Sequence, residues 1–125
     1  MSFHDISCVD MADRTLRDPA TLLPLTPALF HVLLSLADGQ KHGYAILKEV
    51  DRRTNGQVVL STGTLYGIIK RLLADGLIRE SASLSDERRT AYRLTVFGRK
   101  VALAEADRLR TLVVAAERLL AEPSV

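Results

Sequence analysis

The chain has 125 residues, of which 47% are hydrophobic and 26% are charged, and its net charge is +2; these values are typical of one small globular domain. The sequence contains no apolar run of about 18 residues, and its start lacks the basic and apolar regions of a secretory signal, so we expect no membrane partner. Its only cysteine, Cys8, cannot form an intramolecular disulfide. A lone thiol suits a reducing compartment, so we expect a cytoplasmic protein.

Positive charge is concentrated in the middle of the sequence. Residues 26–100 hold twelve lysines and arginines against seven acidic residues, a net charge of +5, whereas the segments on either side are net negative. A basic surface attracts phosphates, so the placement of the charge favours a nucleic-acid partner.

The first 20 residues are polar and acidic, and the sequence Asp18-Pro19 interrupts regular structure there. We expect residues 1–20 to form a flexible or short helical N-terminal arm.

The first full helix is predicted from Thr26-Pro27 to about Ala37, with Thr26 as the N-cap and Pro27 in the first helical position. Leucines and a valine form one apolar face, while Phe30 and Leu34 make a second side apolar as well. A helix that is apolar nearly all round is buried on both sides. Since so small a domain offers one core, we expect the second side to meet another subunit.

Two further helices are predicted before residue 77. One spans about Gly43 to Arg53 and ends before Asn55-Gly56. The next begins at Ser61 or Thr62 and ends at Gly76, a normal C-cap residue. Its inward stripe has helical spacing and consists of Leu65, Ile68, Ile69, Leu72 and Gly76.

Small and basic residues form the outward face of the third helix. Gly63 and Gly67 are among them, and each costs roughly 1 kcal/mol relative to alanine in a helix interior. Close approach to another surface, such as a phosphate backbone, would offset that cost. The alternative is that Gly63 sits in the first turn, where the cost is small, and that Gly67 is incidental.

A basic hairpin is predicted next. Leu77 to Ser81 and Thr90 to Leu94 have strand character, with Ala91 or Tyr92 alternating between the inside and the outside. Arg88 and Arg89, in the polar loop between them, would reach the minor groove or a phosphate. The alternative is a solvated hairpin tip with acidic neighbours balancing the arginines. Three helices followed by such a hairpin predict a mainly α winged helix-turn-helix fold, which commonly reads DNA with its third helix.

The last predicted helix starts after Thr95 and runs to about Ala121. At about 25 residues it spans nearly 40 Å, which is too long for a domain of this size to cover. We therefore expect a winged-helix domain over residues 21–95 and a C-terminal dimerisation helix over residues 96–125. The alternative, in which the C-terminal helix packs back against the first helix of its own chain, would explain only the first half of the C-terminal helix. Its apolar seam has heptad spacing and consists of Ala102, Ala106, Leu109, Val113, Ala116 and Leu120.

These motifs, taken together, resemble the PadR family of bacterial transcriptional regulators. The resemblance implies a homodimeric winged helix-turn-helix repressor of the short subfamily, which has one long C-terminal helix and often responds to small aromatic or cationic effectors. The tryptophan sandwich of some relatives does not carry over, since the chain has no tryptophan. The matching residues are Leu33-Leu34, His42-Gly43-Tyr44 with Ile46, Ser61, Gly63-Thr64-Leu65-Tyr66, Leu72, Asp75-Gly76-Leu77-Ile78, Tyr92-Arg93-Leu94-Thr95 and Gly98-Arg99.

The expected DNA contacts come from the turn before the second helix, the outward faces of the second and third helices, and the hairpin. His42 has the alternative role of capping the second helix, and Tyr44 and Tyr66 could pack by their rings as well as bind phosphates. The full set is His42, Tyr44, Lys48, Arg52, Ser61, Thr62, Gly63, Thr64, Tyr66, Lys70, Arg71, Arg88 and Arg89.

A small aromatic effector would fit between two subunits. The expected lining is Phe30, Leu34, Val101 and the region of Leu109, with Arg108 or Glu105 as a polar anchor. The alternatives are that this surface closes as dimer core and that both charged residues lie on a solvated face.

The sequence offers no set of catalytic residues, and its three histidines are scattered, so we expect no enzyme activity, no metal and no cofactor. The predicted function is a homodimeric transcriptional repressor that binds a pseudo-palindromic operator. The alternative is a winged-helix interaction module that dimerises without binding DNA.

Overall fold

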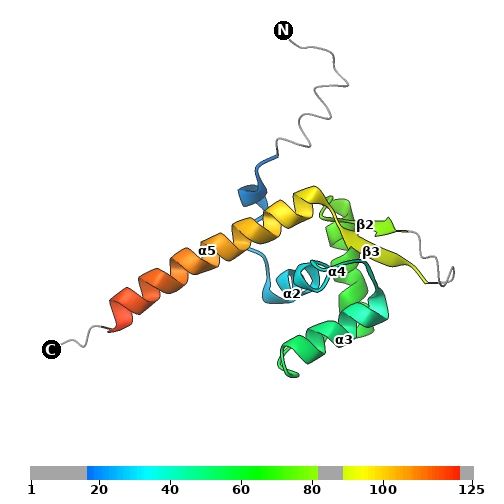
Figure 1. Ribbon diagram of the computed structural model, residues 1–125, viewed down its shortest axis with the longest axis horizontal. Coiled ribbons are helices and arrows are strands. Elements are labelled where there is room, and N and C mark those ends of the chain that lie inside the picture. The colour runs from blue at the N-terminus through cyan, green and yellow to red at the C-terminus, as the bar shows by residue number, and fades with distance from the viewer. Residues whose placement is uncertain (1–16, 82–88, 122–125) are drawn as a thin grey trace, which may run out of the picture.

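The computed structural model describes residues 17–81 and 89–121, and it is mainly helical with one small sheet (Figure 1). The expectations for residues 1–16, which include Cys8, and for Arg88 lie outside these ranges. In chain order the elements are η1 (Pro19–Leu22), α2 (Pro27–Ser35), β1 (Lys41–His42), α3 (Gly43–Arg53), α4 (Thr62–Ala74), β2 (Ile78–Ser81), β3 (Ala91–Leu94) and α5 (Val96–Ala121).

Hydroxyl side chains cap the starts of three helices. The backbone N–H of Leu29 donates to Thr26 Oγ1 at 3.2 Å before α2. The N–H of Thr64 donates to Ser61 Oγ at 3.1 Å before α4, and the N–H of Gly98 donates to Thr95 Oγ1 at 2.9 Å before α5. Because such caps satisfy backbone donors that a helix leaves free, they fix where each helix begins.

The sheet has three antiparallel strands in the order β1-β3-β2. The hairpin β2–β3 agrees with the prediction, whereas β1, a two-residue strand just before α3, was not predicted. Lys41 pairs with Tyr92, and His42 pairs with Ala91. The expected alternation of Ala91 and Tyr92 is wrong, because both are buried, with exposed fractions of 1% and 6%. As the central strand, β3 has neighbours on both sides, which leaves little room for solvent at the small Ala91 side chain.

The core lies between the three helices α2, α3 and α4, the sheet and the first half of α5. Of the stripe predicted to face inward on α4, Ile68 is only half-buried and Gly76 is exposed. Gly76 has a φ of +77°, so it terminates α4 by its backbone conformation. The buried cluster consists of Val32, Leu33, Leu36, Ile46, Val50, Leu65, Ile69, Leu72, Leu77, Ile78, Tyr92 and Val101.

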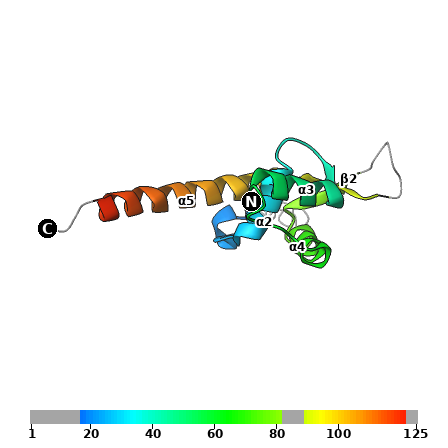
Figure 2. The ribbon, with the colours of Figure 1, turned by 90° about the horizontal axis from the view of Figure 1, so that it is seen from below.

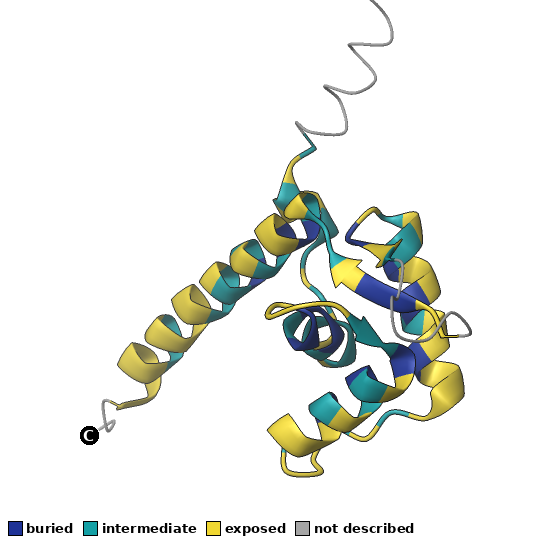
Figure 3. Cartoon of the chain, turned by 45° about the vertical axis from the view of Figure 1, so that its right-hand side comes forward, coloured by how far each residue is buried: buried dark blue, intermediate teal, exposed yellow. Residues whose placement is uncertain are grey.

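Helix α5 projects from this core as one long helix (Figures 1 and 2). Its first half packs against η1 and α2, and Ala102 contacts the core. Its second half is largely exposed (Figure 3). The exposed fraction of Val113 is 52%, and that of Leu120 is 82%. A single chain therefore covers about half of the helix that the sequence predicts to be a packing element.

Arg17 attaches the segment before α2 to the core close to the start of α5. Arg17 donates to the backbone oxygen of Asp75 at 2.6 Å, and its guanidinium carbon lies 4.6 Å from the centre of the Phe97 ring. These contacts hold the described end of the N-terminal segment against the turn after α4 and the first turn of α5.

Candidate nucleic-acid interface

Helices α3 and α4 meet at a contact between a glycine and a tyrosine. Gly43, the first residue of α3, is buried, and a Cβ atom at this position would overlap the hydroxyl group of Tyr66. The absence of a side chain at Gly43 therefore lets the Tyr66 ring lie beside the start of α3. Tyr66 still exposes 45% of its surface, so its position is fixed while part of it faces solvent. This contact places the starts of the two helices side by side.

The outward face of α4 is exposed along its whole length. Ser61 Oγ donates to Thr64 Oγ1 at 2.9 Å, so these two hydroxyl groups support each other at the start of the helix. Cβ atoms built at Gly63 and Gly67 would meet no described atom within 4 Å. The packing of the protein itself therefore does not require a glycine at either position. Close approach of a partner to this face of α4 remains as a reason for both glycines. The exposed residues of this face are Ser61, Thr62, Gly63, Thr64, Tyr66, Gly67, Lys70, Arg71 and Ala74.

The outward face of α3 carries an aromatic ring and basic groups at four-residue spacing. Tyr44 is 62% exposed, and Lys48 Nζ lies 5.4 Å from the centre of its ring. Arg52 lies one turn further on and contacts Glu49 at 2.8 Å. The hydrogen bond from Arg52 holds the pKa of the Glu49 carboxyl below its usual value. The side chains of Tyr44, Lys48 and Arg52 thus follow one side of the helix.

The basic residues of α3 and α4 that are expected to contact DNA fall into two groups. Arg52 and Arg71 form ion pairs with acidic residues of their own helices, Arg71 with Asp75 at 3.7 Å. For Lys48 and Lys70 the described ranges contain no ion pair. Exposed pairs contribute at most about 1 kcal/mol, so the pairing of Arg52 and Arg71 is weak enough to be exchanged for a phosphate.

The capping role predicted for His42 is confirmed in its position but not in its side chain. His42 occupies the N-cap position of α3 without a side-chain hydrogen bond to the helix. Its Nδ1 atom lies 3.4 Å from the backbone oxygen of Thr90 instead. This contact and the pairing of β1 with β3 join the start of α3 to the base of the hairpin. Arg89, the residue before Thr90, is exposed.

The expected effector lining is only partly accessible. Phe30, Leu34 and Leu109 are half-buried in the single chain, whereas Val101 is fully buried in the core and cannot line a pocket.

The solvated face that the sequence suggests for Glu105 and Arg108 is also wrong for Glu105, which is 2% exposed. Arg108 donates two hydrogen bonds to it, each at 2.8 Å. These hydrogen bonds, with a further one from the backbone of Leu25, hold the pKa of the Glu105 carboxyl below its usual value, although burial opposes the shift. Glu105 therefore fastens the segment after η1 to α5.

Residues 17–81 and 89–121 contain no group of three His, Cys, Asp or Glu side chains placed to hold a metal ion. In the same ranges no helix is both long enough and apolar enough to cross a membrane.

The fold and the exposed faces define a class of protein. Two helices joined at the Gly43–Tyr66 contact, the second with an exposed outward face, and an antiparallel hairpin behind them form a winged helix-turn-helix. Comparisons with known proteins identify the family. Residues 32–104, more than half of the chain, match the model of the transcriptional regulator PadR-like family.

Individual relatives agree with that match. The transcriptional regulator Rv3488 of Mycobacterium tuberculosis is 42% identical over 79 residues, which cover 62% of this chain and 70% of that protein. A transcriptional regulator from Clostridium thermocellum, Cth-833, superposes with a TM-score of 0.65 at 26% identity and covers 74% of this chain and 91% of its own. A PadR family transcription regulator from Clostridium difficile R20291 shares the fold, with a TM-score of 0.63, 23% identity and coverage of 74% and 96%.

The chain belongs to the PadR-like family of transcriptional regulators. Membership implies regulation through DNA binding, and the family and its relatives are regulators and not enzymes.

Proposed function

We propose that this regulator is a cytoplasmic repressor that binds a pseudo-palindromic operator as a homodimer. The observation that carries the proposal is the outward face of α4, which is exposed, capped at Ser61 and free of bulky side chains at Gly63 and Gly67. A helix of this shape enters the major groove, where base edges are read.

The proposed contacts divide by role. The exposed start of α4 reads bases, while Lys48, Lys70 and the paired arginines meet phosphates. Tyr44, Tyr66 and His42 lie where α3, α4 and the hairpin come together, and they position the protein on the backbone. From the polar loop between the two hairpin strands of the sequence, Arg88 and Arg89 are proposed to contact the adjacent groove.

The homodimer accounts for the exposed half of α5. Leu109, Val113 and Leu120 lie on one heptad seam, and a second copy of the helix would cover it. Two recognition helices related by a two-fold axis read half-sites roughly one helical turn, about 34 Å, apart. This geometry is the reason for expecting a pseudo-palindromic operator.

An effector, if this regulator has one between its subunits, would bind near Phe30, Leu34 and Leu109, the apolar residues that one chain leaves half-buried. A thermal-shift panel of planar aromatic compounds decides between an effector site there and a closed dimer core. A shift with at least one compound supports the site, and a panel without shifts, together with a dimer structure that lacks a cavity between the subunits, supports the closed core.

The proposed function is tested by a gel shift on DNA upstream of the protein's own gene over a range of salt concentrations. Lys70→Ala removes an exposed charge from α4 that has no ion pair within the described residues. If Lys70 contacts a phosphate, this variant should bind DNA more weakly. The slope of the logarithm of the binding constant against the logarithm of the salt concentration should become shallower by about one unit. Arg118→Ala, which removes an exposed charge from the last turn of α5, is the matched control and should leave the slope unchanged.

An unchanged slope in the Lys70→Ala protein would remove that residue from the contact set. The absence of any salt-dependent binding, by contrast, would favour the interaction module that dimerises without DNA.

A further inference from the structure

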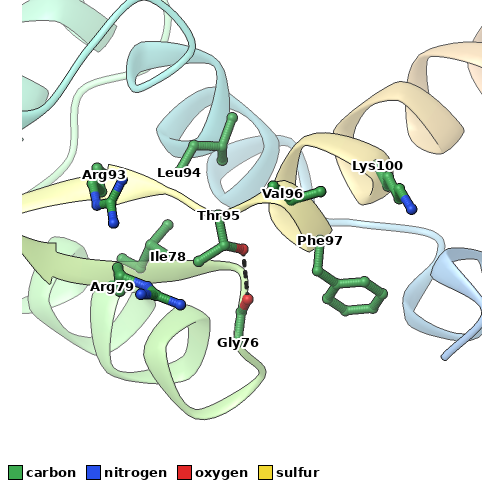
Figure 4. Close-up of a pocket in the computed structure, with 9 residues that line it drawn as sticks. All are labelled: Gly76, Ile78, Arg79, Arg93, Leu94, Thr95, Val96, Phe97 and Lys100. Atoms are coloured by element: carbon green, nitrogen blue, oxygen red, sulfur yellow. Dashed lines mark hydrogen bonds between the residues drawn. The ribbon is translucent and has the colours of Figure 1, made fainter. Parts of the chain in front are cut away.

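A second candidate site lies at the far end of α4 from its Ser61 cap. A cavity of about 520 Å³ opens between the turn at Gly76, the strands β2 and β3, and the first turns of α5 (Figure 4). Its volume falls in the range of small-molecule sites. Helix α4 has 13 residues, so about 20 Å of helix separates the cavity from the proposed DNA-reading end.

Positive charge gathers at this cavity. Arg79 and Arg93 stand directly opposite each other on β2 and β3, and Lys100 adds a third cation from α5. Like charges in opposite positions of a sheet are destabilising. Within the described residues none of the three has an ion pair, and no acidic side chain lines the cavity. Arg108 and Arg110, by comparison, each contact a carboxylate at 2.8 Å.

The remaining walls are apolar or already hydrogen-bonded. Ile78, Leu94 and Phe97 supply hydrocarbon surface, and Figure 4 shows Phe97 on the α5 side of the Gly76 turn. The Thr95 hydroxyl donates to the backbone oxygen of Gly76 at 2.7 Å and accepts from the N–H of Gly98, so the junction is fixed. A ligand would therefore meet the two arginines on the strand side, Lys100 on the α5 side and the apolar walls between them.

We propose that this cavity binds a small organic phosphate, with the phosphate group held by Arg79 and Arg93, the two cations that stand opposite each other on β2 and β3. Guanidinium groups match phosphate oxygens in two-point hydrogen bonds. The charge count favours a phosphate dianion over a single carboxylate, because one carboxylate would leave one of the two guanidinium charges uncompensated. The hydrocarbon walls accommodate the organic part of the molecule.

The phosphate could come from a free ligand or from the DNA backbone, and the experiment separates the two sources. The full-length protein is titrated with inorganic pyrophosphate at constant ionic strength, and binding is followed by the shift in Tm and by calorimetry. We expect a saturable rise in Tm. Arg79→Gln and Arg93→Gln should each raise the half-saturating concentration at least tenfold, equivalent to about 1.4 kcal/mol.

Arg118→Gln is the matched control, because it removes one positive charge from an exposed position at the other end of α5. It should change the half-saturating concentration less than twofold. Circular dichroism of all three variants checks the fold, which should survive since each arginine is exposed.

Three results would overturn the proposal. The first is no saturable rise in Tm for the unaltered protein, and the second is an equal loss in all three variants, which would indicate bulk charge. The third is a gel shift in which Arg79→Gln and Arg93→Gln weaken DNA binding while pyrophosphate does not bind, which would assign these cations to DNA. Pyrophosphate binding lost in Arg79→Gln and Arg93→Gln and kept in Arg118→Gln supports the site, whether or not the protein binds the DNA tested.

Discussion

Gly98 and Gly67 occupy opposite environments although both are helical. A Cβ atom at Gly98 would overlap the backbone oxygen of Leu77, so α5 can begin this close to β2 only without a side chain there. A Cβ atom at Gly67 would meet no described atom within 4 Å.

The same substitution should therefore have opposite effects at these two positions. Gly98→Ala forces backbone to shift, and it should lower the free energy of unfolding by about 1–3 kcal/mol. Gly67→Ala should raise it by up to about 1 kcal/mol, since alanine is the better helix former. Urea unfolding of both variants at one protein concentration measures the difference. Equal stability of Gly98→Ala and the unaltered protein would contradict the close packing.

Glu105 is a buried charge whose role was not predictable from the sequence. Its position on a long helix beside basic and acidic neighbours suggested a solvated face. Burial comes instead from η1 and the segment around Leu25, which lie about 80 residues earlier in the chain. The local sequence pattern around Glu105 does not indicate a contact with residues so distant in the chain, so only the tertiary structure reveals it.

Glu105 should make stability depend on pH in the acid range. Its pKa in the folded protein lies below 4.5, the usual value for a glutamate, chiefly because of the hydrogen bonds from Arg108. A group of this kind contributes stability that is fully present above its unfolded pKa and is lost as the pH falls through its folded pKa. Glu105→Gln should cost about 1 kcal/mol at pH 7, and the difference from the unaltered protein should shrink below about pH 4.5. Thermal unfolding of both proteins between pH 3 and pH 7 tests this, and a difference that stays constant would contradict it.

Among the elements, the helices follow the sequence more closely than the sheet does. The predicted bounds of α3 agree with the structure, and α4 and α5 begin where their hydroxyl caps were expected. Caps, glycine stops and apolar spacing are local signals, so a single sequence carries them. Strand β1 is two residues long and exists because β3 lies beside it. Its pairing is a tertiary contact, and the burial of both Ala91 and Tyr92 follows from the same arrangement.

Part of the candidate interface was also accessible to sequence reasoning. The residues expected on the outward face of α4 are all exposed, because helical periodicity assigns faces directly. The contact between Gly43 and Tyr66 was not predicted, since the two residues belong to different helices. The ion pairs of Arg52 and Arg71 lie within single helices at spacings of three and four residues, and that spacing was the signal available for them.

Helix α4 offers a test of close approach to DNA. Gly67→Leu adds a bulky side chain to its outward face, where the protein itself has open space. If this face enters the major groove, the variant should bind the operator at least tenfold more weakly while its stability does not fall. A gel shift and urea unfolding give the two measurements. Ala74→Leu is the control on the last turn of the same face and should affect DNA binding less. Unchanged operator affinity of Gly67→Leu would remove that position from the contact.

At the scale of the whole molecule, DNA binding and assembly are expected to depend on each other. One chain presents one recognition helix, and the exposed second half of α5 extends away from it (Figure 1). A half-site bound by a single subunit gives only part of the affinity, so specific binding should require the dimer.

Val113→Asp tests that dependence. In the single chain Val113 is 52% exposed, so an aspartate there should leave the fold of the subunit intact. In the proposed dimer it would place a charge in the apolar seam, where each large side chain contributes roughly 1.5–3 kcal/mol on burial and an unpaired charge is strongly unfavourable. Light scattering should therefore report monomers, and specific operator binding should be lost while circular dichroism stays unchanged. Thr111→Asp, an exposed position outside the seam, should remain dimeric and bind the operator. A dimeric Val113→Asp protein would show that the seam is not the interface, and a monomer that keeps full operator affinity would separate DNA binding from assembly.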